Sequence, residues 1–166
     1  NSHNMYAEAL FKRTAAGAGY KGTFKSGTSV IDKIVRQRIG EQHTIVAADG
    51  SGMSRENKLT AHSLALWLAS FNLKEPAGLK LLDSLATPGQ GTLENRFLDI
   101  NFSKATVHGK SGYLRGVCTL SGYITFENRL PIVFSILVND VIGTVKGAKK
   151  MQEELILATI DYVINN

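Results

Sequence analysis

The sequence predicts an α+β fold in which helices pack on a small antiparallel sheet. Helical periodicity dominates the first half of the chain, strand-like runs joined by a short turn occupy residues 105–138, and a helical pattern closes the chain. Helices placed before and after an antiparallel strand pair favour segregated layers over an alternating parallel fold. The length of 166 residues fits one domain over residues 1–166, or a large piece of one.

Two helices are expected at the start of the chain. Residues 4–16 carry apolar side chains at helical spacing, Ser2 is a plausible N-cap, and Gly17 can end the helix. A second amphipathic helix covers residues 26–39 and stops at Gly40. The side chains expected to face inward are Met5, Ala9 and Leu10 in the first helix, and Val30, Ile31, Ile34 and Val35 in the second.

The middle of the chain is predicted to alternate between helices and loops. Residues 43–48 form a short strand-like run, and residues 49–57 form a loop rich in glycine and serine. A strong helix follows over residues 60–71 with Thr60 as its cap, and a leucine-rich helix covers residues 79–85. The segments before the strands are a loop at residues 88–91 and a helical turn at residues 93–97.

Three strands are predicted next, over residues 105–109, 114–126 and 130–138. Residues 127–129 join the second and third strands, which is typical of a hairpin. A terminal helix covers residues 146–164, and the side chains expected on its apolar side are Met151, Leu155, Ile156 and Ile160.

Composition narrows the classes of function. Hydrophobic residues make up 43% and charged residues 20%, as in ordinary globular domains. The net charge of +5 is mild and no dense run of basic residues is present, so nucleic-acid binding is not expected. No apolar run approaches the roughly 20 residues that a membrane span needs. Cys118 is the single cysteine and the four histidines are dispersed, so we expect no disulfide and no metal.

Two short motifs carry the strongest chemical signal. The triplet Ser2-His3-Asn4 opens the chain, and Lys110-Ser111-Gly112 lies far downstream beside a predicted strand. Ser-x-Asn and Lys-Ser/Thr-Gly are two of the three motifs of the penicillin-recognising serine enzymes, and the third, Ser-x-x-Lys, holds the nucleophile. No serine of this sequence has a lysine three positions later. A literal G-x-G-x-x-G at residues 17–22 follows a helix, so it does not indicate a dinucleotide site.

Further blocks make this resemblance specific. Between the two triplets, residues 49–55 are Asp-Gly-Ser-Gly-Met-Ser-Arg, and residues 89–93 and 120–123 add Gly-Gln-Gly-Thr-Leu and Leu-Ser-Gly-Tyr. From Ser2 to about Val138 the chain resembles the class C low-molecular-mass penicillin-binding proteins, the serine D-alanyl-D-alanine carboxypeptidases/endopeptidases of peptidase family S13. In that family the Ser-x-x-Lys segment lies upstream of Ser-x-Asn. The resemblance therefore implies the C-terminal part of such an enzyme, with the N-terminal part of the parent as its partner.

The resemblance assigns roles to seven residues. It implies catalytic roles for Ser2, Asn4 and Lys110, and substrate binding by Ser111, Gly112, Tyr113 and Arg115. A cation at a strand end can hold a substrate carboxylate, and a backbone N–H of that strand can point at a developing oxyanion. Local sequence alone leaves plainer roles open: Ser2 as a helix cap, Lys110 as a solvated strand end and Arg115 as a solvent-facing strand residue.

The function implied is that of a bacterial periplasmic or cell-envelope enzyme without a cofactor. Its parent would trim peptidoglycan stem peptides through an acyl-enzyme, and β-lactam antibiotics would acylate the same serine. An alternative hypothesis, from a different functional class, is a non-catalytic cell-envelope binding or scaffold module that keeps the cleft. Residues 101–103 form an N-glycosylation sequon, but the resemblance to a bacterial family makes this sequon uninformative.

Overall fold

The computed structural model describes residues 2–43, 45–98 and 104–166, and it confirms the α+β class. The chain divides into two compact units, Asn1–Ser70 and Phe71–Asn166. The sequon at residues 101–103 lies outside the described residues. Among the helices that are described, none is both long and apolar enough to cross a membrane.

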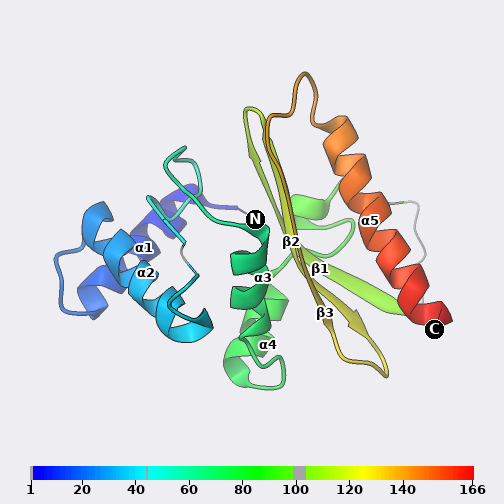
Figure 1. Cartoon of the computed structure of the whole chain (residues 1–166), viewed down its shortest axis with the longest axis horizontal. Helices are drawn as coiled ribbons and strands as arrows, with labels where there is room; N and C mark the ends of the chain where they lie inside the picture. Colours follow the sequence, from blue (N-terminus) through cyan, green and yellow to red (C-terminus); the bar gives the residue numbers. More distant parts are fainter. Residues whose placement is uncertain (1, 44, 99–103) are drawn as a thin grey trace. The chain divides into compact units, whose positions relative to one another are not determined.

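The first unit holds three helices, α1 (Asn4–Gly17), α2 (Phe24–Ile39) and α3 (Ala61–Ala69), drawn in blue to green in Figure 1. Their positions agree with the sequence prediction. Thr23 and Thr60 begin α2 and α3, because each side-chain hydroxyl accepts a hydrogen bond from the backbone N–H three residues later. Gly40 ends α2 as predicted, with a φ of 104°.

The start and the inward face of α1 differ from the prediction. His3, not Ser2, occupies the N-cap position, and its side chain makes no capping hydrogen bond. Met5 and Leu10 are exposed, whereas Phe11 is buried. The helix therefore turns a different stripe inward, because neighbouring apolar stripes on a short helix are equally compatible with the helical period.

The segment after α2 is also less regular than predicted. Among the described residues of the run at 43–48, Val46 makes a single antiparallel bridge to Lys58, and no strand forms there. The loop at residues 49–57 is confirmed. Backbone N–H groups and polar side chains of this loop form hydrogen bonds within the loop and to Glu8 of α1.

The second unit is a three-stranded antiparallel sheet preceded and followed by helices. It contains α4 (Pro76–Ser84), the 3₁₀ turn η1 (Gly91–Leu93) and α5 (Lys146–Asn165). The sheet order is β1-β2-β3, with β1 at Ala105–Leu114, β2 at Val117–Phe126 and β3 at Ile132–Val138. Strand β1 is therefore five residues longer than the predicted 105–109, and β2 starts later than predicted, because a two-residue turn at Arg115 and Gly116 joins them.

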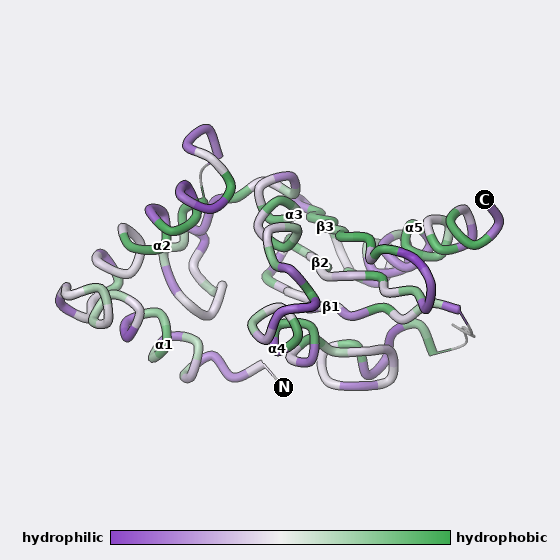
Figure 2. Tube along the Cα trace, turned by 90° about the horizontal axis from the view of Figure 1, so that it is seen from below, coloured by the Kyte–Doolittle hydropathy of each residue, from purple (hydrophilic) through white to green (hydrophobic). Residues whose placement is uncertain are grey.

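The core of this unit lies between the sheet and α5, which crosses one face of the sheet (Figure 1). Figure 2 shows how apolar residues concentrate along β3 and on α5. Met151 and Leu155 were expected to face inward but are exposed, whereas Gln152 is buried and donates to the backbone C=O of Cys118 in β2. The buried apolar residues are Leu93, Phe97, Ala105, Val107, Leu120, Ile124, Ile156 and Ile160.

Candidate active site

The Lys110-Ser111-Gly112 triplet lies inside β1, which is an edge strand of the sheet. The sequence prediction placed this triplet just beyond the end of a shorter strand, so its position within the ladder is a correction. The triplet pairs with the stretch from Thr119 to Ser121 of β2. Its other side is the outer edge of the sheet.

At Gly109 the outer edge of β1 is paired with Ala86, and further along the strand alternate backbone groups point away from the sheet. The N–H and C=O of Gly109 exchange hydrogen bonds with the C=O and N–H of Ala86, at 2.8 and 3.1 Å. Backbone groups of an antiparallel strand alternate in direction with a period of two residues. The backbone N–H groups of Ser111 and Tyr113 therefore also point away from β2. This is the orientation that the predicted oxyanion contact of Tyr113 requires.

Lys110 lies on the face of the sheet opposite to the buried residues Val107 and Gly109, since side chains alternate between faces. Its ammonium donates a hydrogen bond to the backbone C=O of Ser111. Although the residue as a whole is exposed, nearby protein atoms keep water away from the ammonium and lower the pKa of Lys110 below its ordinary value.

The Ser111 side chain points to a different partner. Its hydroxyl donates to the C=O of Thr92 at 3.0 Å, and its N–H approaches the Thr92 hydroxyl at 3.4 Å. A serine has one O–H to donate. Donation by Ser111 to a substrate carboxylate, the role predicted for it, would require this contact with Thr92 to break.

The other substrate-binding candidates lie on or next to the same edge. Gly112 pairs with Thr119, and Tyr113 follows with 62% of its surface exposed. Arg115 is exposed and lies in the turn between β1 and β2, whereas the sequence prediction placed it within the second strand.

Ser2 and Asn4 belong to the first unit, and Lys110 belongs to the second. Asn4 is the first residue of α1, and both Ser2 and Asn4 are exposed. That Ser2 and Asn4 face the same cleft as Lys110 stays a prediction.

The Asp-Gly-Ser-Gly loop is fixed by two carboxylates. Glu8 of α1 accepts from the N–H of Gly50 at 2.9 Å and from the hydroxyl and N–H of Ser51 at 2.5 and 3.2 Å. Asp49 accepts from the N–H groups of Gly52 and Ser54 at 2.8 and 2.6 Å.

These hydrogen bonds stabilise the charged forms of the two carboxylates. The Ser51 hydroxyl and the Gly50 N–H lower the pKa of Glu8, and the Asn57 amide with backbone N–H groups lowers the pKa of Asp49 against the opposing effect of burial. Sequence reasoning missed Glu8, because nothing in its local pattern signals a partner more than forty residues away.

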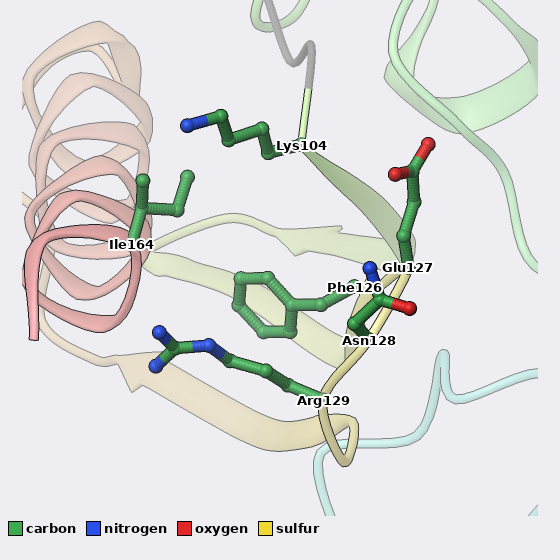
Figure 3. Close-up of a pocket in the computed structure, with 6 residues that line it drawn as sticks. All are labelled: Lys104, Phe126, Glu127, Asn128, Arg129 and Ile164. Atoms are coloured by element: carbon green, nitrogen blue, oxygen red, sulfur yellow. The ribbon is translucent and has the colours of Figure 1, made fainter.

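A separate hollow of about 280 Å³ opens at the other end of β1 (Figure 3). It lies between the turn that joins β2 to β3 and the end of α5, and Lys104 and Arg129 extend along its walls on either side of Phe126. Lys104 precedes β1, six residues before Lys110, so this hollow is not part of the Lys110 site. It is lined by Lys104, Phe126, Glu127, Asn128, Arg129 and Ile164.

Solved structures of a penicillin-binding protein share the fold of this chain. The chain is similar to a crystal structure of penicillin binding protein 4 (dacB) from Haemophilus influenzae, with 25% identity, a TM-score of 0.67, and coverage of 88% of this chain and 33% of that one. A second structure of that protein, complexed with a β-lactam, matches in fold with a TM-score of 0.70 at 24% identity, over 96% of this chain and 38% of that one.

The model of the D-Ala-D-Ala carboxypeptidase 3 (S13) family matches residues 1–159, and the chain belongs to this family. It is 28% identical to carboxypeptidase DacB of Mycolicibacterium smegmatis, over 84% of this chain and 31% of the relative. It is 30% identical to a D-alanyl-D-alanine carboxypeptidase of Actinomadura, over 83% of this chain and 26% of the relative. The chain thus spans less than a third of the length of these relatives.

Proposed function

We propose that residues 1–166 are the C-terminal part of a serine-type D-Ala-D-Ala carboxypeptidase that trims peptidoglycan stem peptides in the bacterial periplasm or cell envelope. The observation that carries this proposal is the Lys110-Ser111-Gly112 triplet on an edge strand whose Tyr113 N–H points outward, in a chain of the S13 family. A peptide laid along this edge can hydrogen-bond to it as an added strand.

The chemistry is acyl transfer in two steps. A serine of a Ser-x-x-Lys segment outside residues 1–166 attacks the carbonyl carbon between the two D-alanines, and the N–H of Tyr113 stabilises the oxyanion. The serine hydroxyl gives up its proton as the ester forms, the C–N bond breaks, and D-alanine leaves with one proton delivered to its amine through Ser2 and Lys110. Water then hydrolyses the ester and restores the serine. No metal or organic cofactor enters either step.

The remaining candidates hold the substrate. The Lys110 ammonium attracts the terminal carboxylate, assisted by Arg115 at the end of the strand, while Asn4 hydrogen-bonds the peptide amide. Gly112 has no side chain, so a substrate can approach the backbone of the strand closely at this position. A β-lactam presents a carbonyl and a carboxylate in a similar relation, and it acylates the same serine.

The test is acylation of the full-length form that contains this chain by a labelled penicillin, alongside release of D-alanine from a D-Ala-D-Ala peptide. Lys110→Ala should lower the acylation rate at least about tenfold, because it removes a charge-assisted hydrogen bond worth roughly 1.5–3 kcal/mol. Lys104→Ala is the matched control, since it removes an exposed lysine just before the same strand. Equal rates for the two variants would exclude Lys110 from the site.

The same experiment separates the enzyme from the binding or scaffold module. Such a module would retain penicillin or stem peptide reversibly and would form no covalent adduct. A stoichiometric adduct on a serine, together with D-alanine release, rejects that reading.

A further inference from the structure

A threonine of β2 occupies the space left by the glycine of the triplet. Thr119 lies directly opposite Gly112 in the β1–β2 pair. A Cβ atom added at Gly112 would lie 2.5 Å from the Thr119 hydroxyl oxygen, far inside van der Waals contact. The Thr119 hydroxyl therefore leans over β1 at the position where any other residue would carry its side chain.

This hydroxyl differs from its neighbours, because it has no hydrogen-bond partner among the residues that the structure describes. The Ser111 hydroxyl donates to Thr92, and the Ser121 and Ser135 hydroxyls pair with each other at 2.9 Å. Within residues 2–43, 45–98 and 104–166, no hydrogen bond joins the side chain of Thr119 to another residue, although Thr119 is half-buried. No side-chain oxygen or nitrogen among the described residues is both buried and unpaired, so the Thr119 hydroxyl is accessible to water or to a ligand.

The positive charge of Lys110, on the same face as Thr119, indicates that the ligand is anionic. Lys110 and Gly112 are two residues apart and share one face of β1, and residues paired directly across an antiparallel ladder share that face too. Thr119 therefore lies on the Lys110 side of the sheet, opposite to the core. A hydroxyl donor and a partly desolvated ammonium on one face of an edge strand suit an anionic oxygen group.

We propose that Thr119 is a further substrate-binding residue that donates a hydrogen bond to the terminal carboxylate of the D-amino-acid peptide, in the space above Gly112. This inference rests on the proposed function and deepens it. Thr119 then supplies a hydroxyl donor for the carboxylate that is available without breaking a protein hydrogen bond, whereas Ser111 must first give up its contact with Thr92.

The test compares two probes that differ in that carboxylate, benzylpenicillin and its methyl ester, on the full-length form that contains this chain. Thr119→Val keeps the shape of the side chain and removes the hydroxyl. It should slow acylation by benzylpenicillin about tenfold to a hundredfold and leave acylation by the ester close to that of the unchanged protein. Thr119→Ser should restore most of the lost rate. Thr106→Val, on the same face of β1 but six residues from Gly112, is the control and should change neither rate.

The outcomes separate this inference from the proposed function. If the unchanged protein is acylated and Thr119→Val reacts normally with both probes, the role of Thr119 is rejected and the carboxypeptidase proposal stands. An equal loss with both probes also rejects carboxylate binding, since it indicates a general disturbance of the strand. If the unchanged protein neither reacts with penicillin nor releases D-alanine, the proposed function fails and this inference fails with it.

Discussion

Lys110 and Ser111 of the triplet differ in how readily their side chains can bind a substrate. Lys110 has three N–H donors and uses one on the C=O of Ser111, so it can bind a carboxylate without losing that contact. Ser111 would have to give up Thr92. Of the two side chains, Lys110 is therefore the one that can bind an anion without breaking a protein hydrogen bond, and under the proposed function we expect its protonation to control carboxylate binding.

Carboxylate recognition should fall as pH rises through the pKa of Lys110, which burial places below the ordinary lysine value of 10.5. Below that pKa the ammonium is charged and binds the anion. Acylation by benzylpenicillin, measured against pH, should therefore show a basic limb below pH 10.5, and Lys110→Arg should move it upward because arginine stays protonated. If the basic limb lies at the same pH in the arginine variant, it arises from the titration of a group other than Lys110.

The same shift has a consequence for stability, with a defined sign. Between the lowered pKa of the folded protein and the ordinary value of the unfolded chain, the unfolded chain binds more protons. The contribution of Lys110 to the free energy of unfolding therefore rises with pH across that window.

Among the elements, the pairing of β1 with β2 depends on a close approach of two backbones. Gly122 faces Gly109, and a Cβ atom at Gly122 would lie 1.9 Å from the backbone C=O oxygen of His108. A backbone atom cannot move aside as a side-chain tip can. The register that places Lys110 opposite Ser121 is therefore tied to a glycine at position 122.

Gly122→Ala should lower the free energy of unfolding by more than about 3 kcal/mol, because the strands must separate to admit the methyl group. Denaturant unfolding measures the effect. Gly147→Ala is the control, because the added methyl group at the start of α5 meets no atom within 4 Å and should stabilise by up to about 1 kcal/mol. A small loss in Gly122→Ala would show that β1 and β2 are less closely paired.

A buried arginine joins the turn after η1 to α5. Arg96 is 3% exposed and donates to the carboxylate of Glu153 at 2.7 Å, the side-chain oxygen of Gln152 at 3.1 Å and the C=O of Lys149 at 2.8 Å. Gln152 continues the network by donating to the C=O of Cys118 in β2. This network fixes the turn that carries Thr92, the partner of Ser111.

Arg96→Met should cost about 3 kcal/mol of stability, because it removes one partner of a buried, hydrogen-bonded ion pair. Lys150→Met is the matched control, since Lys150 pairs with Glu154 on the exposed side of α5 at 3.6 Å and should contribute less than about 0.5 kcal/mol. Thermal or denaturant unfolding of both variants distinguishes them. Similar losses would mean that the Arg96 pair is no more than a surface pair.

For the molecule as a whole, the residues proposed for the site come from two units, each described by itself. Ser2 and Asn4 lie in the first unit and the triplet in the second, and no serine of the 166 residues has the Ser-x-x-Lys spacing. The S13 proposal therefore predicts that Ser2 and Lys110 approach within hydrogen-bond reach, about 2.6–3.2 Å or through one water, in the complete enzyme.

The 166-residue chain alone should not be acylated by a labelled penicillin, because it contains no serine with the nucleophile's spacing. Mass spectrometry of the intact chain after incubation is the measurement. The full-length form serves as the positive control. A stoichiometric adduct on a serine of this chain would show that the nucleophile had been placed wrongly.

The sequence by itself determined the α+β class, the existence and type of the helices, the chemical motifs and the presence of a hairpin after Phe126, although its connection runs to residue 131 rather than 129. Helical spacing, capping threonines such as Thr60 and short motifs are local, so they act whatever surrounds them. Family membership followed from the same local blocks. Gly116 lies within residues 114–126, which were predicted as one strand. Its presence there indicated a turn between β1 and β2, and the sequence prediction did not use it.

Only the tertiary structure decided which faces are buried and which polar groups meet. Phe11 rather than Met5 faces inward in α1, and Gln152 rather than Met151 does so in α5, because the choice of stripe depends on the surface against which each helix packs. The pairing of Glu8 with Ser51 and the approach of Thr119 to Gly112 join residues through the fold. A local pattern carries no information about such partners, since side-chain contacts between elements arise only when the chain has folded.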